Sequence, residues 1–344
     1  MREADRTLSD RVIGSGVVDV LGMTGCYRDP LWRVAVDLTA LERELSRCWW
    51  VRRLAFIAHA GAAAAASTQT YSRLEHSLGL LALVVHFDPD DHVTRAAALL
   101  HDIGHLPLSH TLEHVAGLDH HSLGAERTED LCEVLTRHGV APEEVIASDT
   151  GERPSLLSGA PGVLKLDHLE SLVRGGRAHG RTQQAPPVTL DRLAVVDGCV
   201  STDRDTAAYL ADLVVGEARW VCSTVNAVPT GVVRHLGTLL LQEASTTRRS
   251  QIAASTDDEL WGLLLSDPST ADAARALRRD PMSWQAVDPG TAAARNTGAI
   301  GYAVTRLYLD VPLVDGAPLD RDHEAFRDLP VLPWHRAILA PPAT

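Results

Sequence analysis

Residues 94–103, TRAAALLHDI, are nearly all apolar and end with a His-Asp pair. A helix that is apolar on every side must be enclosed by other elements, so this segment predicts a short helix at the centre of a helical domain. Gly104 and Pro107 follow closely and predict that the helix ends near the pair. The His-Asp pair and the loop after it are therefore expected to face a cavity.

Several other segments predict helices. Thr39 and Glu42 form a capping box, which predicts a helix from there to about Ala60. Gly175-Gly176 are expected to stop a helix that begins near residue 162. Further helices are expected over residues 71–87, 121–138, 162–174, 205–221, 230–245, 257–265 and 271–279, and short strands within 190–197 and 300–313.

The chain has 344 residues, enough to bury a large core. The pattern of elements suggests an N-terminal segment over 1–30 and a metal-binding helical core over 31–180. Residues 181–344 are expected to be a helical extension with short strands, within the same globular unit. No function is predicted for the last 30 or so residues.

Composition excludes several classes of protein. The formal net charge of −13 disfavours a general nucleic-acid binder, which needs a basic surface. The longest apolar runs, such as 78–87, are about ten residues long, and a membrane span needs roughly 18 or more. Five scattered cysteines, an odd number, and an N-terminus without an apolar signal region favour a cytoplasmic protein with reduced thiols.

Histidine is concentrated in one part of the chain. Of 16 histidines, 13 lie between His59 and His179. His76, the pair His101-Asp102 and Asp167 fall on separate predicted helices, and helices of one bundle can direct such side chains at a shared centre. Two imidazoles and two carboxylates predict one divalent metal ion, for which Mn, Fe, Co, Ni, Zn and Mg all remain open.

Three stretches carry a family resemblance: 71-YSRLEHSLG-79, 98-ALLHDIGHLPLSH-110 and 165-KLDHLESLVR-174. In order and spacing they resemble the HD-domain phosphohydrolases, and within them the branch of deoxynucleoside triphosphate triphosphohydrolases. The resemblance covers roughly residues 30–310. It implies a mainly α fold, an HD-domain helical bundle with a few short β segments in the C-terminal part.

The resemblance also implies roles for individual residues. Glu113 is expected to orient His110, and Arg73 resembles an arginine that contacts phosphate. The implied metal ligands are His76, His101, Asp102 and Asp167; the implied catalytic residues are His105, His110, His121 as general acid, and Glu113; the implied substrate-binding positions are Arg73, His59, His168, Ser171 and Arg174.

The chain departs from that branch after the last metal ligand. The branch usually has a basic residue, then Asp-Tyr, then Arg-Asp, whereas this chain has His168, Glu170-Ser171 and Arg174-Gly175. His59 stands where such enzymes place a glutamine near the base. We therefore expect the hydrolytic chemistry to be retained and the substrate to differ.

The resulting hypothesis is a metal-dependent phosphohydrolase acting on a nucleotide or related phosphorylated metabolite, with a monophosphate favoured. Three alternatives remain open. They are a deoxynucleoside triphosphate triphosphohydrolase releasing tripolyphosphate, a non-enzymatic nucleotide-binding regulator, and an oxygenase with two irons. A homo-oligomer is compatible with the resemblance, because this branch often assembles through helices outside the metal core.

Overall fold

The central helix predicted from the apolar run is α5, His92–Leu100. Asp91 caps its N-terminus by accepting a hydrogen bond from the Thr94 N–H, and every residue from Thr94 to Leu100 is buried. It packs between α4, Arg73–Phe87, and α8, Pro142–Thr150. The prediction of an enclosed helix at the centre of a helical domain is confirmed.

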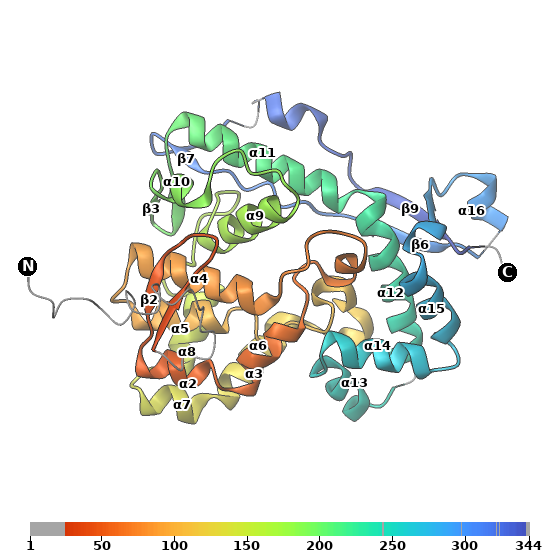
Figure 1. The fold of residues 1–344 in the computed structure, drawn as a ribbon, viewed down its shortest axis with the longest axis horizontal. Coiled ribbons are helices and arrows are strands. Elements are labelled where there is room, and N and C mark those ends of the chain that lie inside the picture. Colours follow the sequence, from red (N-terminus) through yellow and green to blue (C-terminus); the bar gives the residue numbers. More distant parts are fainter. Residues whose placement is uncertain (1–24, 243, 297, 321, 323, 342–344) are drawn as a thin grey trace, which may run out of the picture.

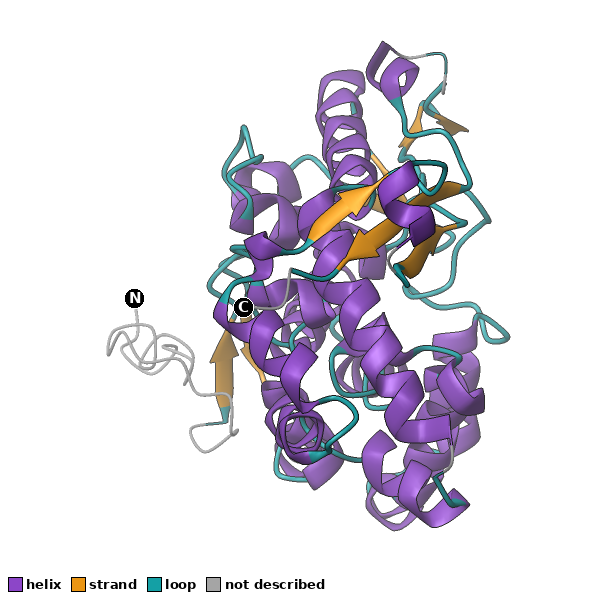
Figure 2. Cartoon of the chain, turned by 90° about the vertical axis from the view of Figure 1, so that its right-hand side faces the viewer, coloured by secondary structure: helices purple, strands orange, loops and turns teal. Residues whose placement is uncertain are grey.

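The computed structural model describes residues 25–242, 244–296, 298–320, 322 and 324–341. It is mainly α-helical, with short strands (Figures 1 and 2), as predicted. The predicted N-terminal segment 1–30 lies outside the described residues except for 25–30. Within the described ranges, every helix is too short or too polar to cross a membrane.

The other helices are grouped by their order in the chain, which the colours of Figure 1 follow. Those of the first half are α2 Ala40–Leu45, α3 Trp49–Arg53, α6 His120–Asp130, α7 Cys132–Arg137 and α9 Leu166–Ala178. Those of the second half are α10 Pro186–Leu190, α11 Arg204–Val221, α12 Thr224–Gln242, α13 Thr246–Ala253, α14 Asp257–Ser266, α15 Ala271–Arg279 and α16 Ala292–Asn296. Short 3-10 turns at Gly61–Ala65, Ser109–Leu112 and Val115–Gly117 connect the first group to α12, against which all three pack.

Within the part of the chain that the structure describes, the strands form three small sheets. In the second sheet β4 and β7 run parallel, and all other strand pairs are antiparallel. The sheets are β1 Cys26–Arg28 with β2 Ala35–Asp37; β3 Ala194–Val196, β4 Cys199–Ser201, β7 Leu313–Val314 and β8 Ala317–Pro318; and β5 Gln285–Val287, β9 Trp334–Leu339 and β6 Ile300–Val304. The third sheet packs on α12.

The loop after α5 lies between two hydrophobic cores. One core is formed largely by α4, α5, α9 and α11. The other is formed by α12, α14, α15 and β9, and it includes Leu106, Leu108 and Leu112 from the loop. The loop is therefore held by apolar contacts on its C-terminal side while its His-Asp end stays next to the first core.

Three helix predictions need correction. The helix expected from residue 40 to about Ala60 is interrupted after α2, where the Ser46 hydroxyl donates to the Glu42 carbonyl. The helix expected over 121–138 is divided at Leu131 into α6 and α7. Gly175-Gly176 do not stop α9, which continues to Ala178.

Gly176 serves packing rather than termination. A Cβ atom on Gly176 would lie 2.9 Å from Leu213 Cδ2 of α11, closer than such contacts allow. The absence of a side chain there lets α9 and α11 approach each other.

The short strands expected within residues 300–313 are present. They are Ile300–Val304 and Leu313–Val314, and residues 305–310 between them have no regular structure. The sequence analysis predicted no helix over residues 142–150, although Pro142 occupies the first turn of α8, a position that proline favours.

Asp257 of α14 holds two loops together. Its Oδ2 accepts a hydrogen bond from the Ala58 N–H at 2.8 Å and its Oδ1 accepts one from the Leu108 N–H at 2.6 Å. Leu108 and Ser109 both have positive φ, 56° and 53°, a conformation that costs about 1–3 kcal/mol per residue unless its surroundings impose it. Asp257 is therefore placed to keep this strained loop in position.

We expect Asp257→Asn to lower the free energy of unfolding by about 1–3 kcal/mol, because an amide can accept from only one of the two N–H groups. Burial raises the pKa of Asp257 to about 6, so urea unfolding should be measured at pH 8, where the carboxylate is ionised. Asp258→Asn, one position along and exposed, is the matched control and should have little effect. Equal stability of both variants would contradict this role.

Candidate metal centre

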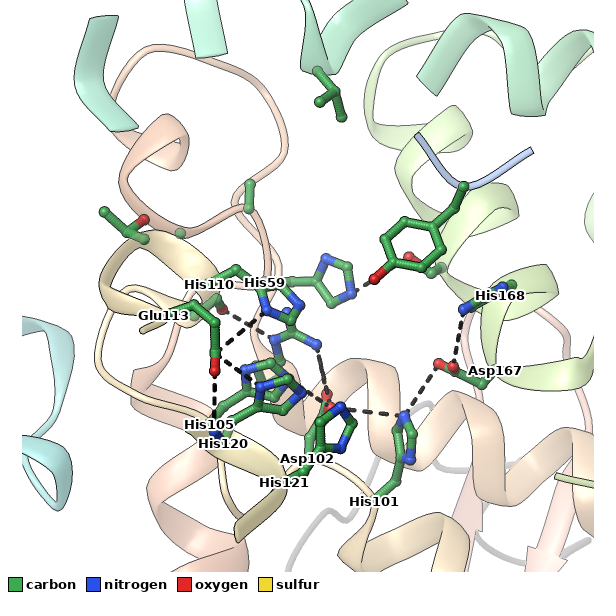
Figure 3. A pocket seen from close by; sticks show the side chains of 18 of the residues that line it. His59, His101, Asp102, His105, His110, Glu113, His120, His121, Asp167 and His168 are labelled. Carbon is green, nitrogen blue, oxygen red and sulfur yellow. Dashed lines mark hydrogen bonds and ion pairs between the residues drawn. The ribbon is translucent and has the colours of Figure 1, made fainter. Parts of the chain in front are cut away.

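The four predicted metal ligands meet at one point. His76 comes from α4. His101 and Asp102 come from the turn after α5, and Asp167 from the first turn of α9 (Figure 3). Asp167 Oδ1 lies 3.2 Å from His76 Nε2 and 3.3 Å from His101 Nε2. The Asp102 oxygens lie 3.9 Å from the same two nitrogens.

These spacings fit a divalent ion. Neighbouring ligands of an octahedral ion at about 2.1 Å stand about 3 Å apart, close to the separations around Asp167. The donor set is two imidazole nitrogens and carboxylate oxygens, and the donor atoms of His76, His101 and Asp167 lie within 4.8 Å of one another. The residues present therefore suit a metal of the mixed N/O class.

Both carboxylates are ionised in this setting. Burial raises the pKa of Asp167, but His101 and His76 outweigh it and bring that pKa well below its usual value. Burial also raises the pKa of Asp102, but Arg73 and His105 outweigh burial and bring that pKa well below its usual value. A buried and a partly buried carboxylate that face one point make a centre suited to a cation.

Each liganding histidine is held from behind by a carboxylate. His76 Nδ1 lies 2.5 Å from Glu170 Oε2, and His101 Nδ1 lies 2.5 Å from Asp149 Oδ1. Bonds of this kind fix the ring orientation and leave Nε2 to face the metal. Sequence analysis missed Asp149. Glu170 was noted only as a departure from the family pattern, although it follows Asp167 by three residues on the same helix.

Asp149 offers a clean test of this support, because it is partly exposed and lies at the end of α8. We expect Asp149→Asn to weaken metal binding about 10- to 100-fold, since the amide cannot stabilise the His101 ring as a carboxylate does. The affinity would be measured by titrating the metal-free protein with Mn²⁺. Glu152→Gln, exposed and three residues away, is the control and should bind Mn²⁺ as the unaltered chain does.

A second group of histidines adjoins the metal centre. The donor atoms of His105, His110 and His120 also lie within 4.8 Å of one another, so this group too has the spacing of metal ligands. The His105 and His120 rings stack at 4.5 Å, and His110 meets both edge-on (Figure 3). His105 Nε2 lies 3.1 Å from Asp102 Oδ1, which joins the two groups.

Gly104 makes this arrangement possible. A Cβ on Gly104 would lie 2.0 Å from the His120 carbonyl oxygen and 2.5 Å from the Gly124 nitrogen. Because it has no side chain, the start of α6 approaches the His-Asp turn directly and His120 reaches His105. Gly104 was expected to end α5, but that helix has already ended at Leu100.

Glu113 contacts His120 more closely than the predicted partner, His110. Its Oε2 lies 2.8 Å from His120 Nδ1 and 3.8 Å from His110 Nδ1. Burial raises the pKa of Glu113, but the neighbouring His110 and His120 bring it below its usual value. His121, the predicted general acid, also lines the cavity, with its ring 3.9 Å from that of His120.

Two histidines of the second group have lowered pKa values. Burial and the charge of Arg73 hold the pKa of His105 well below its usual value, and burial also lowers the pKa of His110. His105 Nδ1 is buried and, among the described residues, has no hydrogen-bond partner. Because Nε2 donates to the Asp102 carboxylate, Nδ1 of a neutral His105 is an acceptor, and a hydroxyl or N–H donor would satisfy it.

The predicted substrate positions are only partly brought together. His59 and Ser171 face each other, with Nε2 3.5 Å from Oγ, and both line the cavity. Arg73 lines it too, but its Nη1 is 3.0 Å from Asp102 Oδ2. Arg174 lies elsewhere, buried and paired with Asp29 and Glu170.

His168 lines the cavity beside Asp167. Its Nδ1 lies 2.6 Å from Oδ2 of Asp310, a residue that the sequence reading did not single out. Four imidazoles of the site thus have Nδ1 on a carboxylate: His76 on Glu170, His101 on Asp149, His120 on Glu113 and His168 on Asp310. In each case Nε2 is the nitrogen left for another partner.

The cavity that joins these groups has a volume of about 660 Å³. The metal centre and the second histidine group line one part of it. Side chains of α11 and α12 and residues 302–308 and 310 complete the lining. This size suits a small organic molecule.

Comparison with protein families finds a match over part of the chain. The family model of the HD domain matches residues 73–150. The match includes His76, His101 and Asp102 and ends before Asp167.

A curated relative resembles the chain in sequence over a short stretch. An uncharacterized protein from Methanocaldococcus jannaschii is 43% identical over 61 residues, 17% of this chain. The chain therefore spans only 13% of the length of that relative.

Solved structures resemble it over a longer range. A hypothetical protein from Aquifex aeolicus has a TM-score of 0.60 at 17% identity, over 76% of this chain and 77% of that one. A phosphohydrolase from Bacteroides thetaiotaomicron has a TM-score of 0.59 at 18% identity, over 76% of this chain and 78% of that one. These likenesses show the fold, which extends well beyond the HD domain.

Proposed function

We propose that this protein is a metal-dependent phosphohydrolase that cleaves a phosphate ester of a nucleotide or related phosphorylated metabolite. One observation carries the proposal: a His/Asp metal centre and a second group of histidines line the same cavity. The HD domain, and the fold shared with a phosphohydrolase, support it.

A divalent metal bound at this centre supplies a Lewis acid for a phosphoryl oxygen and a water of lowered pKa. The chain itself supplies the remaining groups. His110 lines the cavity and can donate a hydrogen bond to a phosphate oxygen, while His105, beside it, is held by Asp102 through Nε2. With Nδ1 held by Glu113, His120 has Nε2 left to exchange a proton with the leaving group.

Among phosphorylated substrates we favour a monophosphate. The basic side chains that follow Asp167 are engaged by carboxylates: His168 by Asp310, and Arg174 by Asp29 and Glu170. These pairings leave less positive charge for a longer phosphate chain. Deoxynucleoside triphosphate hydrolysis, with release of tripolyphosphate, is the alternative that the same experiment tests.

The experiment begins with bound metal measured by mass spectrometry. The protein is then incubated in Mn²⁺ with nucleoside mono-, di- and triphosphates, and phosphate, pyrophosphate and tripolyphosphate are separated. Phosphate released from monophosphates is the expected result. Tripolyphosphate would establish the alternative substrate, and a protein that takes up no metal after reconstitution would overturn the proposal.

A further inference from the structure

Residues 305–310 place a C-terminal segment beside the metal centre. They connect β6 to β7, and all of them except Leu309 line the cavity. Just beyond them the Val311 carbonyl accepts a hydrogen bond from the Leu164 N–H at 2.9 Å, shortly before α9 begins. This contact fixes the segment to the chain that leads into Asp167.

A side-chain pair joins the segment to α9. Asp310 Oδ2 lies 2.6 Å from His168 Nδ1, and both residues are largely buried, with side-chain exposures of 19% and 26%. His168 directly follows the metal ligand Asp167, and its Nε2 is 3.6 Å from Asp167 Oδ2. A residue that packs against His168 therefore lies close to the metal centre.

Tyr308 packs against His168. Its ring meets the His168 ring edge-on at 5.4 Å, and the Arg306 guanidinium lies over the ring at 4.9 Å from its centre. Although supported on two sides, Tyr308 lines the cavity with 62% of its surface exposed. An aromatic ring that neighbouring side chains hold in place, and that stays exposed to the cavity, can stack against another flat ring.

We propose that Tyr308, supported by Arg306 and His168, is the subsite that binds the planar aromatic part of the substrate, a nucleobase, and that Asp310 positions this subsite through His168. This rests on the proposed function and adds to it the chemical class of the leaving group. Tyr308 is then a binding residue, while Asp310 is a positioning residue that acts through the His168 ring.

Binding of two inert ligands tests the subsite separately from catalysis. The ligands are the phosphonate analogues of adenosine 5′-monophosphate and of ribose 5-phosphate, in which a P–C bond replaces the scissile P–O bond. They share the sugar and the anionic head and differ by the base. With the Mn²⁺-loaded protein we expect the adenosine analogue to bind about tenfold more tightly by calorimetry, as stacking on one aromatic side chain would give.

Variants assign the preference to particular residues. Tyr308→Ala should bind both ligands equally, whereas Tyr308→Phe, which keeps the ring, should keep the preference. Asp310→Ala should reduce it, and Asp310→Asn, which retains an oxygen for the His168 N–H, should restore most of it. Trp49→Ala removes a 53% exposed aromatic ring that does not line the cavity, and should match the unaltered protein.

The outcomes separate this inference from the proposed function. Equal binding of the two ligands by the unaltered protein, or no measurable binding of the adenosine analogue, would overturn the subsite. A preference that survives Tyr308→Ala would do the same. A preference that depends on Tyr308 in a protein that hydrolyses no phosphate ester would support the subsite and remove the proposed catalysis.

Discussion

Replacing His101 and Asp102 together by alanine is expected to abolish metal binding and phosphate-ester hydrolysis. The double change removes one imidazole and one carboxylate from a centre that has two of each. A metal ion supplies several kcal/mol of transition-state stabilisation, and each 1.36 kcal/mol is tenfold in rate, so turnover should fall by at least about 10³-fold. Mass spectrometry of the purified variant and the nucleotide hydrolysis assay measure the two effects.

The control for this variant is a His and Asp pair elsewhere on the surface. His86→Ala with Asp90→Ala changes the same residue types at the far end of α4 and in the turn after it, where both are exposed. It should keep metal and activity. A His101/Asp102 variant that had lost its metal and still hydrolysed substrate would show that the centre is not catalytic.

A second variant guards against a failure to fold. Asp102 is buried and paired with Arg73, so its removal leaves a buried guanidinium without its carboxylate, which can destabilise a protein strongly. Asp167→Asn retains the shape of the side chain and leaves that pair intact. It should lower metal affinity and turnover together while the thermal unfolding transition stays close to that of the unaltered chain.

The candidate metal centre could be predicted from sequence because its four residues sit in short local patterns. His101 and Asp102 are adjacent, and His76 and Asp167 lie on helices whose apolar spacing is clear. The carboxylates behind them are a different case. Asp149 comes from α8, which sequence reading missed, and Asp310 is separated from His168 by 142 positions. Only the tertiary fold brings such partners together.

Glycine shows the same limit in the fold itself. Gly104 and Gly176 were expected to end helices, since glycine commonly does so. Each instead lies where another helix approaches the backbone, α6 at Gly104 and α11 at Gly176. A sequence shows that a side chain is missing, but whether the space is used for a turn or for a neighbouring helix depends on the packing.

His120→Ala is expected to lower kcat by about 10²- to 10⁴-fold while leaving bound metal unchanged, the range typical for loss of a general acid or base. His120 is expected to transfer the proton because Glu113 fixes its Nδ1 and its ring stacks on that of His105. His121, the residue favoured from sequence, has an exposed position in the first turn of α6. We therefore expect His121→Ala to have the smaller effect on kcat in the nucleotide hydrolysis assay.

Glu113→Gln decides whether the pair works as a unit. If Glu113 acts by holding His120, its substitution should lower kcat in the unaltered background and have almost no further effect once His120 is alanine. Additive losses would mean that Glu113 acts through His110, which its other contact permits at 3.8 Å. A larger fall in kcat for His121→Ala than for His120→Ala would contradict the role of His120. It would show that His121 exchanges the proton with the leaving group.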